Sequence, residues 1–333
     1  MKFGLALDFA TPVRTLDQQI DRYVELLRVA ERHGFDSVTA GEGYATRPEW
    51  GHVSSPLLVL AALAPRTSLR LGTSVTLLPT WNPLKLAYDA AALDQISGGR
   101  LILGIGLGGP AVQRRFGTDP ARVGEFVDDA LAMMRALWRG EKGFHGSLLS
   151  TDQSIGMLPI REGGPTVWVG GSLRRSARRA AHFGDGWCAS TNYGFDVIAR
   201  QSARYREELA REGKPAANGT VAINRLAVVA DSDSAARAAA RIYAGRVLQR
   251  YARNGALGSD PEVVSGEPGQ LFERFDLDWC LVGTPDVVIE RIQRYVDAGV
   301  TQIQMRVSPD DLPLDVAARS VELIGEAVLP KFQ

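Results

Sequence analysis

The stretch Leu71–Gly109, LGTSVTLLPTWNPLKLAYDAAALDQISGGRLILGIGLGG, carries the signals of a strand, a helix and a second strand in close succession. The run Leu69–Leu78 is apolar and rich in β-branched residues, which predicts a buried strand. Asn82 and Pro83 predict a helix start, with asparagine as N-cap and proline in the first turn. After a glycine turn, Leu101–Gly106 is apolar on both faces, as strands of a parallel sheet are. The stretch is therefore typical of an α/β protein.

The same alternation of strand and helix patterns runs along the whole chain. Strands are expected near Phe3–Leu7, Ser37–Gly41, Leu69–Leu78, Leu101–Ile105, Thr166–Val169, Gly186–Ser190, Val221–Val229 and Thr301–Val307. Helices are expected between them, among others at Leu16–His33, Arg174–His182, Asp196–Glu212, Ser234–Asn254 and near Asp286–Ala298. Because no linker or change of composition divides the chain, we expect one domain over residues 1–333. Eight alternations favour a closed (β/α)8 TIM barrel over two open doubly wound domains.

Two segments, near 141–164 and 255–281, do not fit the alternation. The first is rich in Gly, Ser and Asp, and the second contains two prolines and several glycines. Long loops are uncommon in compact domains unless they form lids or binding walls. We therefore expect both to be insertions at the C-terminal face, the first of them covering the barrel. The alternative for the second is a surface loop without ligand contact.

Composition argues against several classes of protein. The 38 basic residues balance the 38 acidic ones, so nothing indicates a nucleic-acid or membrane partner. Residues Met1–Asp8 suit a first strand better than a signal peptide, and the apolar run Pro56–Ala64 is too short to cross a bilayer. Cys188 and Cys280 lie in apolar surroundings and are expected to be buried free thiols rather than a disulfide or reactive thiols. These features predict a cytoplasmic protein.

Candidate site residues follow from the position of the active site in TIM barrels, which is at the C-terminal ends of the strands. The residues at or just past these ends are Glu42; Ser74, Val75 and Thr76; Leu107, Gly108 and Gly109; Gly170, Gly171 and Ser172; and Ser190 and Thr191. His52 lies further along the loop that follows the second strand. No cluster of His, Cys, Asp and Glu has the spacing of metal ligands, so no metal is expected.

The residues after the fifth strand form a candidate anion site. Gly170, Gly171 and Ser172 lead directly into a predicted helix, whose free backbone N–H groups and dipole favour an anion. Hydroxyl groups of Ser190 or Thr191 after the sixth strand could complete a phosphate site. The alternative is that the two glycines only make a tight turn.

Four motifs in order give the chain a resemblance to a known family. The first is the quoted stretch itself, with GTSV, NPLKLA and LDQISGGRLILGIGLGG. The other three are VWVGGS at Val167–Ser172, RAAHFGDGW at Arg179–Trp187 and GTPD at Gly283–Asp286. Together they resemble the luciferase-like monooxygenase superfamily and span most of the chain. The resemblance implies a TIM barrel and an oxidoreductase that uses a flavin or a deazaflavin.

The resemblance also implies how the cofactor is held. It places the cofactor phosphate near Gly171, Ser172, Ser190 and Thr191, and it implies a non-prolyl cis peptide bond between Ser74 and Val75. The cofactor is expected to be FMN, with the deazaflavin coenzyme F-420 as the alternative. Some deazaflavin relatives carry a lysine at the position that Tyr193 occupies in this chain. The absence of a basic residue there favours FMN. In the superfamily, insertions in the later part of the chain shape the substrate entrance.

The catalytic assignment departs from the family's pattern. Relatives often carry an acidic residue followed by a catalytic histidine, whereas Glu42 is followed here by Gly43 and Tyr44. His52 or Tyr44 could take the histidine's role. We expect Glu42 to lie near the cofactor ring and to matter more than His52, because a strand end holds its side chain rigidly. The alternative is that Glu42 pairs with an arginine and only shapes the loop.

The resemblance predicts a flavin-dependent monooxygenase that acts on a small, largely apolar organic substrate. A deazaflavin-dependent hydride-transfer enzyme and a non-catalytic flavin-binding protein are alternatives. The phosphate site alone would also suit a barrel lyase or isomerase with a phosphorylated substrate. A homodimer, or a separate reductase that supplies reduced cofactor, is the expected protein partner.

Overall fold

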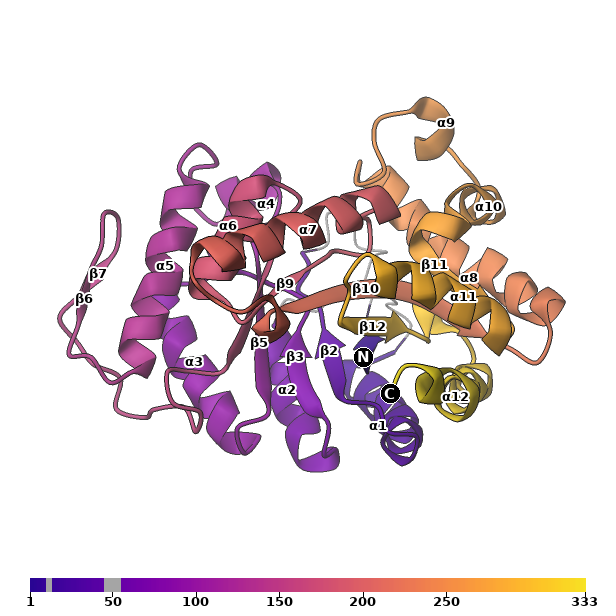
Figure 1. Ribbon diagram of the computed structural model, residues 1–333, viewed down its shortest axis with the longest axis horizontal. Helices are drawn as coiled ribbons and strands as arrows, with labels where there is room; N and C mark the ends of the chain where they lie inside the picture. The colour runs from indigo at the N-terminus through magenta and orange to yellow at the C-terminus, as the bar shows by residue number, and fades with distance from the viewer. Residues whose placement is uncertain (10–13, 45–54) are drawn as a thin grey trace.

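The computed structural model describes residues 1–9, 14–44 and 55–333 of the chain, and within these residues parallel strands close into a barrel surrounded by helices (Figure 1). The eight strands of the barrel are β1 (Lys2–Leu7), β2 (Ser37–Ala40), β3 (Arg70–Thr73), β5 (Leu101–Gly106), β8 (Thr166–Gly170), β9 (Gly186–Cys188), β10 (Thr220–Val229) and β12 (Gln302–Arg306). The helices are α1 (Leu16–Arg32), α2 (Pro56–Leu63), α3 (Pro83–Ile96), α4 (Pro110–Arg115), α5 (Val123–Trp138), α6 (Arg174–Phe183), α7 (Phe195–Arg211), α8 (Asp233–Arg253), α9 (Pro261–Val264), α10 (Pro268–Trp279), α11 (Pro285–Asp297) and α12 (Leu314–Leu323). The TIM-barrel prediction is confirmed.

The barrel closes because β10 and β12 complete the ring between β9 and β1. The first residues of β10 pair with β9, and the middle residues of β10 pair with β12. β1 then pairs with β12 on one side and with β2 on the other. A further strand, β11 (Cys280–Gly283), pairs with the end of β10 and was not predicted. Trp279 ends α10 and Cys280 begins β11, so no turn residue marks this boundary in the sequence.

The predicted strand Leu69–Leu78 is divided in the structure. β3 ends at Thr73, the peptide bond between Ser74 and Val75 is cis as the resemblance implied, and β4 (Thr76–Leu77) then pairs with β5. A Cβ atom at Gly104 would lie 2.1 Å from the carbonyl oxygen of Thr73. The interruption therefore packs tightly against β5, where glycine makes room for it.

The main hydrophobic core lies between the barrel and its helices, as in other TIM barrels. A smaller apolar cluster of Ile102, Trp168, Cys188 and Ala222, with Val75 against it, lies apart from this core. These residues come from four strands, and their positions alternate with core residues along each strand, which places them inside the barrel.

The two irregular segments lie in different places. Residues 141–164 contain the hairpin β6 (Phe144–His145) and β7 (Ser150–Thr151), which stands at the left edge of Figure 1. The N–H of Ile160 donates a hydrogen bond to Asp94. Asp94 lies near the C-terminal end of α3, close to the start of β5 and so at the N-terminal face of the barrel. This segment therefore does not cover the C-terminal face, contrary to expectation. Residues 255–281 contain α9 and α10, and α10 packs on α8.

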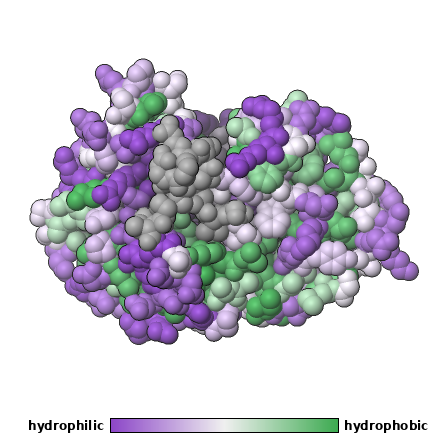
Figure 2. All heavy atoms as spheres, turned by 180° about the vertical axis from the view of Figure 1, so that it is seen from behind, coloured by the Kyte–Doolittle hydropathy of each residue, from purple (hydrophilic) through white to green (hydrophobic). Residues whose placement is uncertain are grey.

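One helix carries apolar residues on its outer side. α2 has the sequence PLLVLAAL, without a polar side chain, and Leu58 on it is 70% exposed. In Figure 2, the view from behind, hydrophobic atoms gather on the surface directly below the atoms drawn in grey. A helix that is hydrophobic all round is normally buried all round. No helix among the described residues is long and apolar enough to cross a membrane.

Candidate active site

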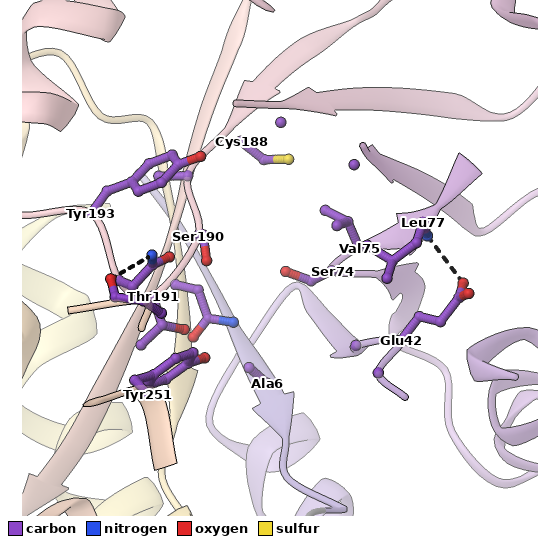
Figure 3. Close-up of a pocket in the computed structure, with 18 of the residues that line it drawn as sticks. Ala6, Glu42, Ser74, Val75, Leu77, Cys188, Ser190, Thr191, Tyr193 and Tyr251 are labelled. Carbon is purple, nitrogen blue, oxygen red and sulfur yellow. Dashed lines mark hydrogen bonds between the residues drawn. The ribbon is translucent and has the colours of Figure 1, made fainter. Parts of the chain in front are cut away.

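A cavity of about 740 Å³ opens at the C-terminal ends of the barrel strands. The predicted site residues that line it are Glu42, Ser74, Val75, Leu107, Gly108, Gly109, Gly170, Gly171, Ser172, Ser190 and Thr191. They come from strands that are far apart in sequence, so the barrel brings them together. Figure 3 shows Glu42, Ser74 and Val75 on one side of this cavity and Ser190 and Thr191 on the other.

Two predicted site residues are not among those that line the cavity. Thr76 lies in β4 with its side chain fully buried, and its neighbours Val75 and Leu77 line the cavity instead. Because side chains alternate along a strand, Thr76 faces away from the cavity. His52 falls in the range 45–54, outside the described residues.

One side of the cavity is made of small and apolar residues and is called the apolar wall: Val75, Leu77, Gly106, Leu107 and Gly108. A Cβ atom at Gly106 would lie 2.5 Å from Cγ2 of Val75, so the backbone of β5 packs directly against that side chain. A wall with so few projecting side chains suits one face of a flat aromatic ring. The residues present therefore fit the ring of a flavin or a deazaflavin.

The loop between β8 and α6, residues Gly171–Leu173, has its carbonyl groups held from behind. The Trp187 indole N–H and the Gln201 amide donate hydrogen bonds to the carbonyl oxygen of Gly171 at 2.9 and 3.2 Å. Gln201 also donates to the carbonyl oxygen of Leu173 at 2.9 Å. In a trans peptide the N–H points opposite to the carbonyl. The N–H groups of Ser172 and Arg174 therefore point away from Trp187 and Gln201.

These N–H groups lie at the start of α6, and no described residue accepts a hydrogen bond from them. Within the described part of the chain, no side chain caps the helix at Leu173. Ser172 lines the cavity, and a hydrogen bond joins it to the partly buried Tyr193. Burial raises the pKa of Tyr193, which that hydrogen bond only partly offsets, so its hydroxyl stays neutral. The helix start and these neutral hydroxyls fit a phosphate group.

A buried arginine that sequence reasoning missed holds the loop after β9. Arg225 is fully buried, and its guanidinium donates to the carbonyl oxygens of Asn224 and Tyr193 at 2.8 Å and of Thr191 at 3.4 Å, and to the hydroxyl of Tyr295 at 2.8 Å. Among the described residues, no carboxylate forms a salt bridge with it. The one signal in the sequence is a single charge inside the apolar strand β10.

Glu42 is surrounded by hydrogen-bond donors, none of which is an arginine. Its carboxylate accepts from the backbone N–H of Leu77 at 3.0 Å, drawn in Figure 3. It also accepts from the Trp81 indole at 2.9 Å, the Thr80 hydroxyl at 2.7 Å and the Tyr44 hydroxyl at 2.6 Å. Four donors fill the acceptor positions of a carboxylate. Glu42 thus joins the loop after β2 to the segment after β4.

Tyr44 lies beside Glu42 and keeps its phenol proton. Burial and the hydrogen bond to Glu42 raise the pKa of Tyr44 to about 12. Its ring packs against Phe116 with 4.6 Å between the ring centroids. A phenol with this pKa keeps its proton at neutral pH and serves as a hydrogen-bond donor.

The side of the cavity that faces the apolar wall carries charged and polar groups and is called the polar wall: Asp8, Asn224, Arg250, Tyr251 and Arg306. Burial raises the pKa of Asp8, but the charges of Arg306 and Arg250 outweigh it and lower the pKa to about 2. Arg306 ends β12, so the rule that found Glu42 would also have found it. Arg250 and Tyr251 come from α8, and no strand-end rule points to them.

Comparison with known proteins agrees with this geometry. The sequence profile of the luciferase-like monooxygenases matches residues 1–302. An F-420-dependent glucose-6-phosphate dehydrogenase of Rhodococcus hoagii is 30% identical, over 84% of this chain and 86% of its own. The oxygenase component of a flavin-dependent trigonelline monooxygenase of Acinetobacter baylyi is 30% identical, over 51% of this chain and 48% of its own.

A solved structure shows the same fold at full length. The monooxygenase RslO1 from Streptomyces bottropensis covers 100% of both chains, with a TM-score of 0.86 and 26% sequence identity. Relatives therefore include both flavin-dependent and F-420-dependent enzymes. The chain belongs to the luciferase-like monooxygenase family and is an oxidoreductase that uses a flavin or a deazaflavin.

Proposed function

We propose that this protein is an FMN-dependent monooxygenase that receives reduced FMN from a separate reductase. The observation that carries the proposal is the β8–α6 loop beside the apolar wall: side chains bind its carbonyl groups from behind, so that its N–H groups point away from them and can bind an anion. Tyr193, a neutral residue, stands next to this site, which suits a single phosphate. A relative that is named as an oxygenase component supports the separate reductase.

The residues divide the work of such an enzyme between them. When bound, FMN supplies the redox chemistry. Ser172, Ser190 and Thr191 bind its phosphate together with the N–H groups of the β8–α6 loop. Val75 and Leu77 pack against the ring and exclude water from that face. Glu42 holds the loops that carry Tyr44 and Trp81, so we propose that it positions the site and transfers no proton.

Titration of the cofactor-free protein with FMN and with coenzyme F-420, each followed by fluorescence, tests the proposal. We expect FMN to bind and F-420 to bind at least tenfold more weakly. Tighter binding of F-420 would make the protein a deazaflavin-dependent dehydrogenase instead. Binding of FMN without formation of an oxygenated product from any candidate substrate, when reduced FMN and O2 are both supplied, would favour a non-catalytic flavin-binding protein.

The role of His52 stays a prediction. Glu42→Gln and His52→Ala should be compared under identical conditions with reduced FMN. Greater loss of turnover in Glu42→Gln agrees with the importance of Glu42. Loss of turnover in His52→Ala alone would assign the family's histidine function to His52.

We further propose a homodimer through α2 and a cytoplasmic location. The exposed Leu58 on a helix without polar side chains supports the dimer. Cys188 and Cys280 are free, buried thiols, as expected, and burial raises the pKa of Cys188 to about 12. Such thiols are unreactive and suit a reducing compartment.

A further inference from the structure

Arg225 is a fully buried positive charge that no carboxylate neutralises within the described part of the chain. Its guanidinium donates hydrogen bonds to three backbone carbonyl oxygens and to the hydroxyl of Tyr295, all of which are uncharged. The Tyr295 ring centroid lies 5.0 Å from the guanidinium carbon, a further uncharged contact. A charge removed from water is normally stabilised by an opposite charge. The described residues leave the charge of Arg225 without such a counter-charge.

The ionisable groups near Arg225 do not balance its charge. Asp276 and Arg225 both act on the pKa of the Cys280 thiol, so the three groups lie in one region. Arg237 and Arg291 already pair with Asp276, at N–O distances of 2.9 and 2.7 Å. Burial raises the pKa of Cys280, so its thiol stays neutral. Neither Asp276 nor Cys280 therefore supplies a free negative charge to Arg225.

Arg225 lies directly behind the loop between β9 and α7, residues 189–194. Its two Nη atoms donate to the carbonyl oxygens of Thr191 at 3.4 Å and of Tyr193 at 2.8 Å. Both of these residues line the cavity, whereas Arg225 does not. Figure 3 shows Thr191 and Tyr193 together with Ser190 on the side of the cavity opposite Val75. The backbone of this loop therefore separates the charge of Arg225 from the cavity.

The peptide groups of the loop are oriented by Arg225. The carbonyl of Thr191 points to the guanidinium, so the N–H of Asn192 in the same trans peptide points the opposite way. No described residue accepts a hydrogen bond from that N–H, and Asn192 lines the cavity. Tyr193 connects the loop to the start of α6 through its hydrogen bond with Ser172. The positive charge and the N–H group it orients both favour an anion at this side of the cavity.

We propose that Arg225 is the buried counter-charge of the cofactor's phosphate group and makes the site select a phosphorylated flavin over an unphosphorylated one. Arg225 is a positioning residue, because it acts through the backbone of Thr191 and Tyr193 and does not touch the phosphate. The inference rests on the proposed function for the identity of the ligand. It assigns the selection of the phosphate to a residue outside the cavity.

FMN and riboflavin test this role, because they share the ring and differ by the phosphate. Their dissociation constants are measured by quenching of flavin fluorescence with the cofactor-free wild type, Arg225→Met and Arg225→Lys. Methionine and lysine have similar size, and only lysine carries a charge. The quantity compared is the phosphate preference, which is the dissociation constant of riboflavin divided by that of FMN. A variant that only loosens the ring pocket changes both constants alike and leaves this ratio unchanged.

We expect Arg225→Met to lower the phosphate preference about tenfold and Arg225→Lys to stay within about threefold of wild type. Arg291→Met is the matched control, because it removes another largely buried arginine whose charge Asp276 already neutralises. It should lower the melting temperature and leave the phosphate preference unchanged. Circular dichroism shows which variants are folded. Arg225→Gln, a neutral side chain that keeps hydrogen-bond donors, replaces Arg225→Met in the comparison if the latter does not fold.

An unchanged phosphate preference in the folded neutral variant would overturn the role of Arg225, and so would an equal loss in Arg225→Lys. If wild type binds FMN no more tightly than riboflavin, the proposed function fails, and inorganic phosphate then tests Arg225 separately. Its binding is measured by isothermal titration calorimetry. At least fivefold weaker binding of phosphate by the neutral variant would support the counter-charge. Equal binding in both proteins, or no binding by wild type, would overturn it.

Discussion

The carboxylate of Glu42 connects parts of the chain that are distant in sequence. Its donors come from the backbone of Leu77 and the side chains of Tyr44, Thr80 and Trp81. The sequence predicts the position of Glu42, because it follows an apolar strand. It does not predict these partners, because the contact requires the loop after β2 to meet the segment after β4. The residue therefore has a position that can be read from the sequence and a role that cannot.

Glu42→Gln should destabilise the protein. A glutamine side chain keeps one acceptor oxygen and turns an N–H group toward donors, so at least one buried donor loses its partner. We expect the free energy of unfolding to fall by about 1–3 kcal/mol, measured by urea denaturation. Lys85→Gln, at an exposed ion pair on α3, is the control and should change it by less than about 0.5 kcal/mol. Equal stability of Glu42→Gln and wild type would mean that the network contributes little.

Asp8 predicts a loss of stability in acid. Its pKa is about 2 in the folded protein against an ordinary value of 3.8, so the folded state favours the ionised form. This contribution, on the order of 2 kcal/mol, is complete above pH 4 and is lost as the pH falls toward 2. Urea unfolding at pH 5 and pH 2.5 measures it.

Asp8→Asn should remove this part of the pH dependence. It also leaves the buried Arg306 without its carboxylate, so we expect about 3–5 kcal/mol of destabilisation at pH 7. A variant that retains the full acid dependence of wild type would show that other carboxylates cause it.

At the scale of elements, the loops after β8 and β9 form one unit around the proposed anion site. Buried side chains behind the loops, above all Gln201 and Arg225, bind their carbonyl groups and leave N–H and hydroxyl groups toward the cavity. The glycines of this region predict the site from sequence, because they let the backbone approach a ligand. The buried supports come from α7 and β10, and only the folded structure connects them to the loops.

Gly170 offers a sharper test of the cofactor site than Gly171. Gly171 has a φ of +138°, and a Cβ atom there would lie 2.2 Å from the Ser176 hydroxyl, so substitution disturbs the loop itself. A Cβ atom at Gly170 meets its neighbours at 3.4 Å, an ordinary contact. Because Gly170 lines the cavity, Gly170→Ala should weaken FMN binding about tenfold in a fluorescence titration.

The melting temperature of the cofactor-free Gly170→Ala protein should stay close to that of wild type. Gly156→Ala, at a glycine with open space around it in the segment 141–164, is the matched control and should change neither quantity. Unchanged FMN affinity in Gly170→Ala would place the cofactor elsewhere in the cavity.

At the scale of the whole molecule, the periodicity of apolar residues predicts the barrel, but only tertiary contacts determine which residues surround the cavity at its C-terminal end. The eight predicted strands correspond to the eight strands that close the ring, because each is an apolar run bounded by turns. β11 escaped prediction because helix α10 runs directly into it. Only part of the polar wall can be predicted from the sequence. Asp8 and Arg306 lie at strand ends, where site residues are expected, whereas Arg250 and Tyr251 lie on α8, and only the folded structure shows that α8 reaches the cavity. The position of the segment 141–164 likewise involves a hydrogen bond from the N–H of Ile160 to Asp94, and no sequence pattern predicts this contact.

The apolar face of α2 leads to a prediction about assembly. A helix without a polar side chain gains stability only where its faces are covered, and Leu58 is 70% exposed in the single chain. We expect a second copy of the chain to cover it, because a twofold axis buries the same face of both copies. Leu58→Lys would place two charges in that interface and should convert a dimer to a monomer in analytical ultracentrifugation at micromolar concentration. Leu277→Lys, on α10 at 66% exposure, is the matched control and should leave the dimer intact. A monomeric wild type would refute this interface, and dissociation by Leu277→Lys alone would move it to α10.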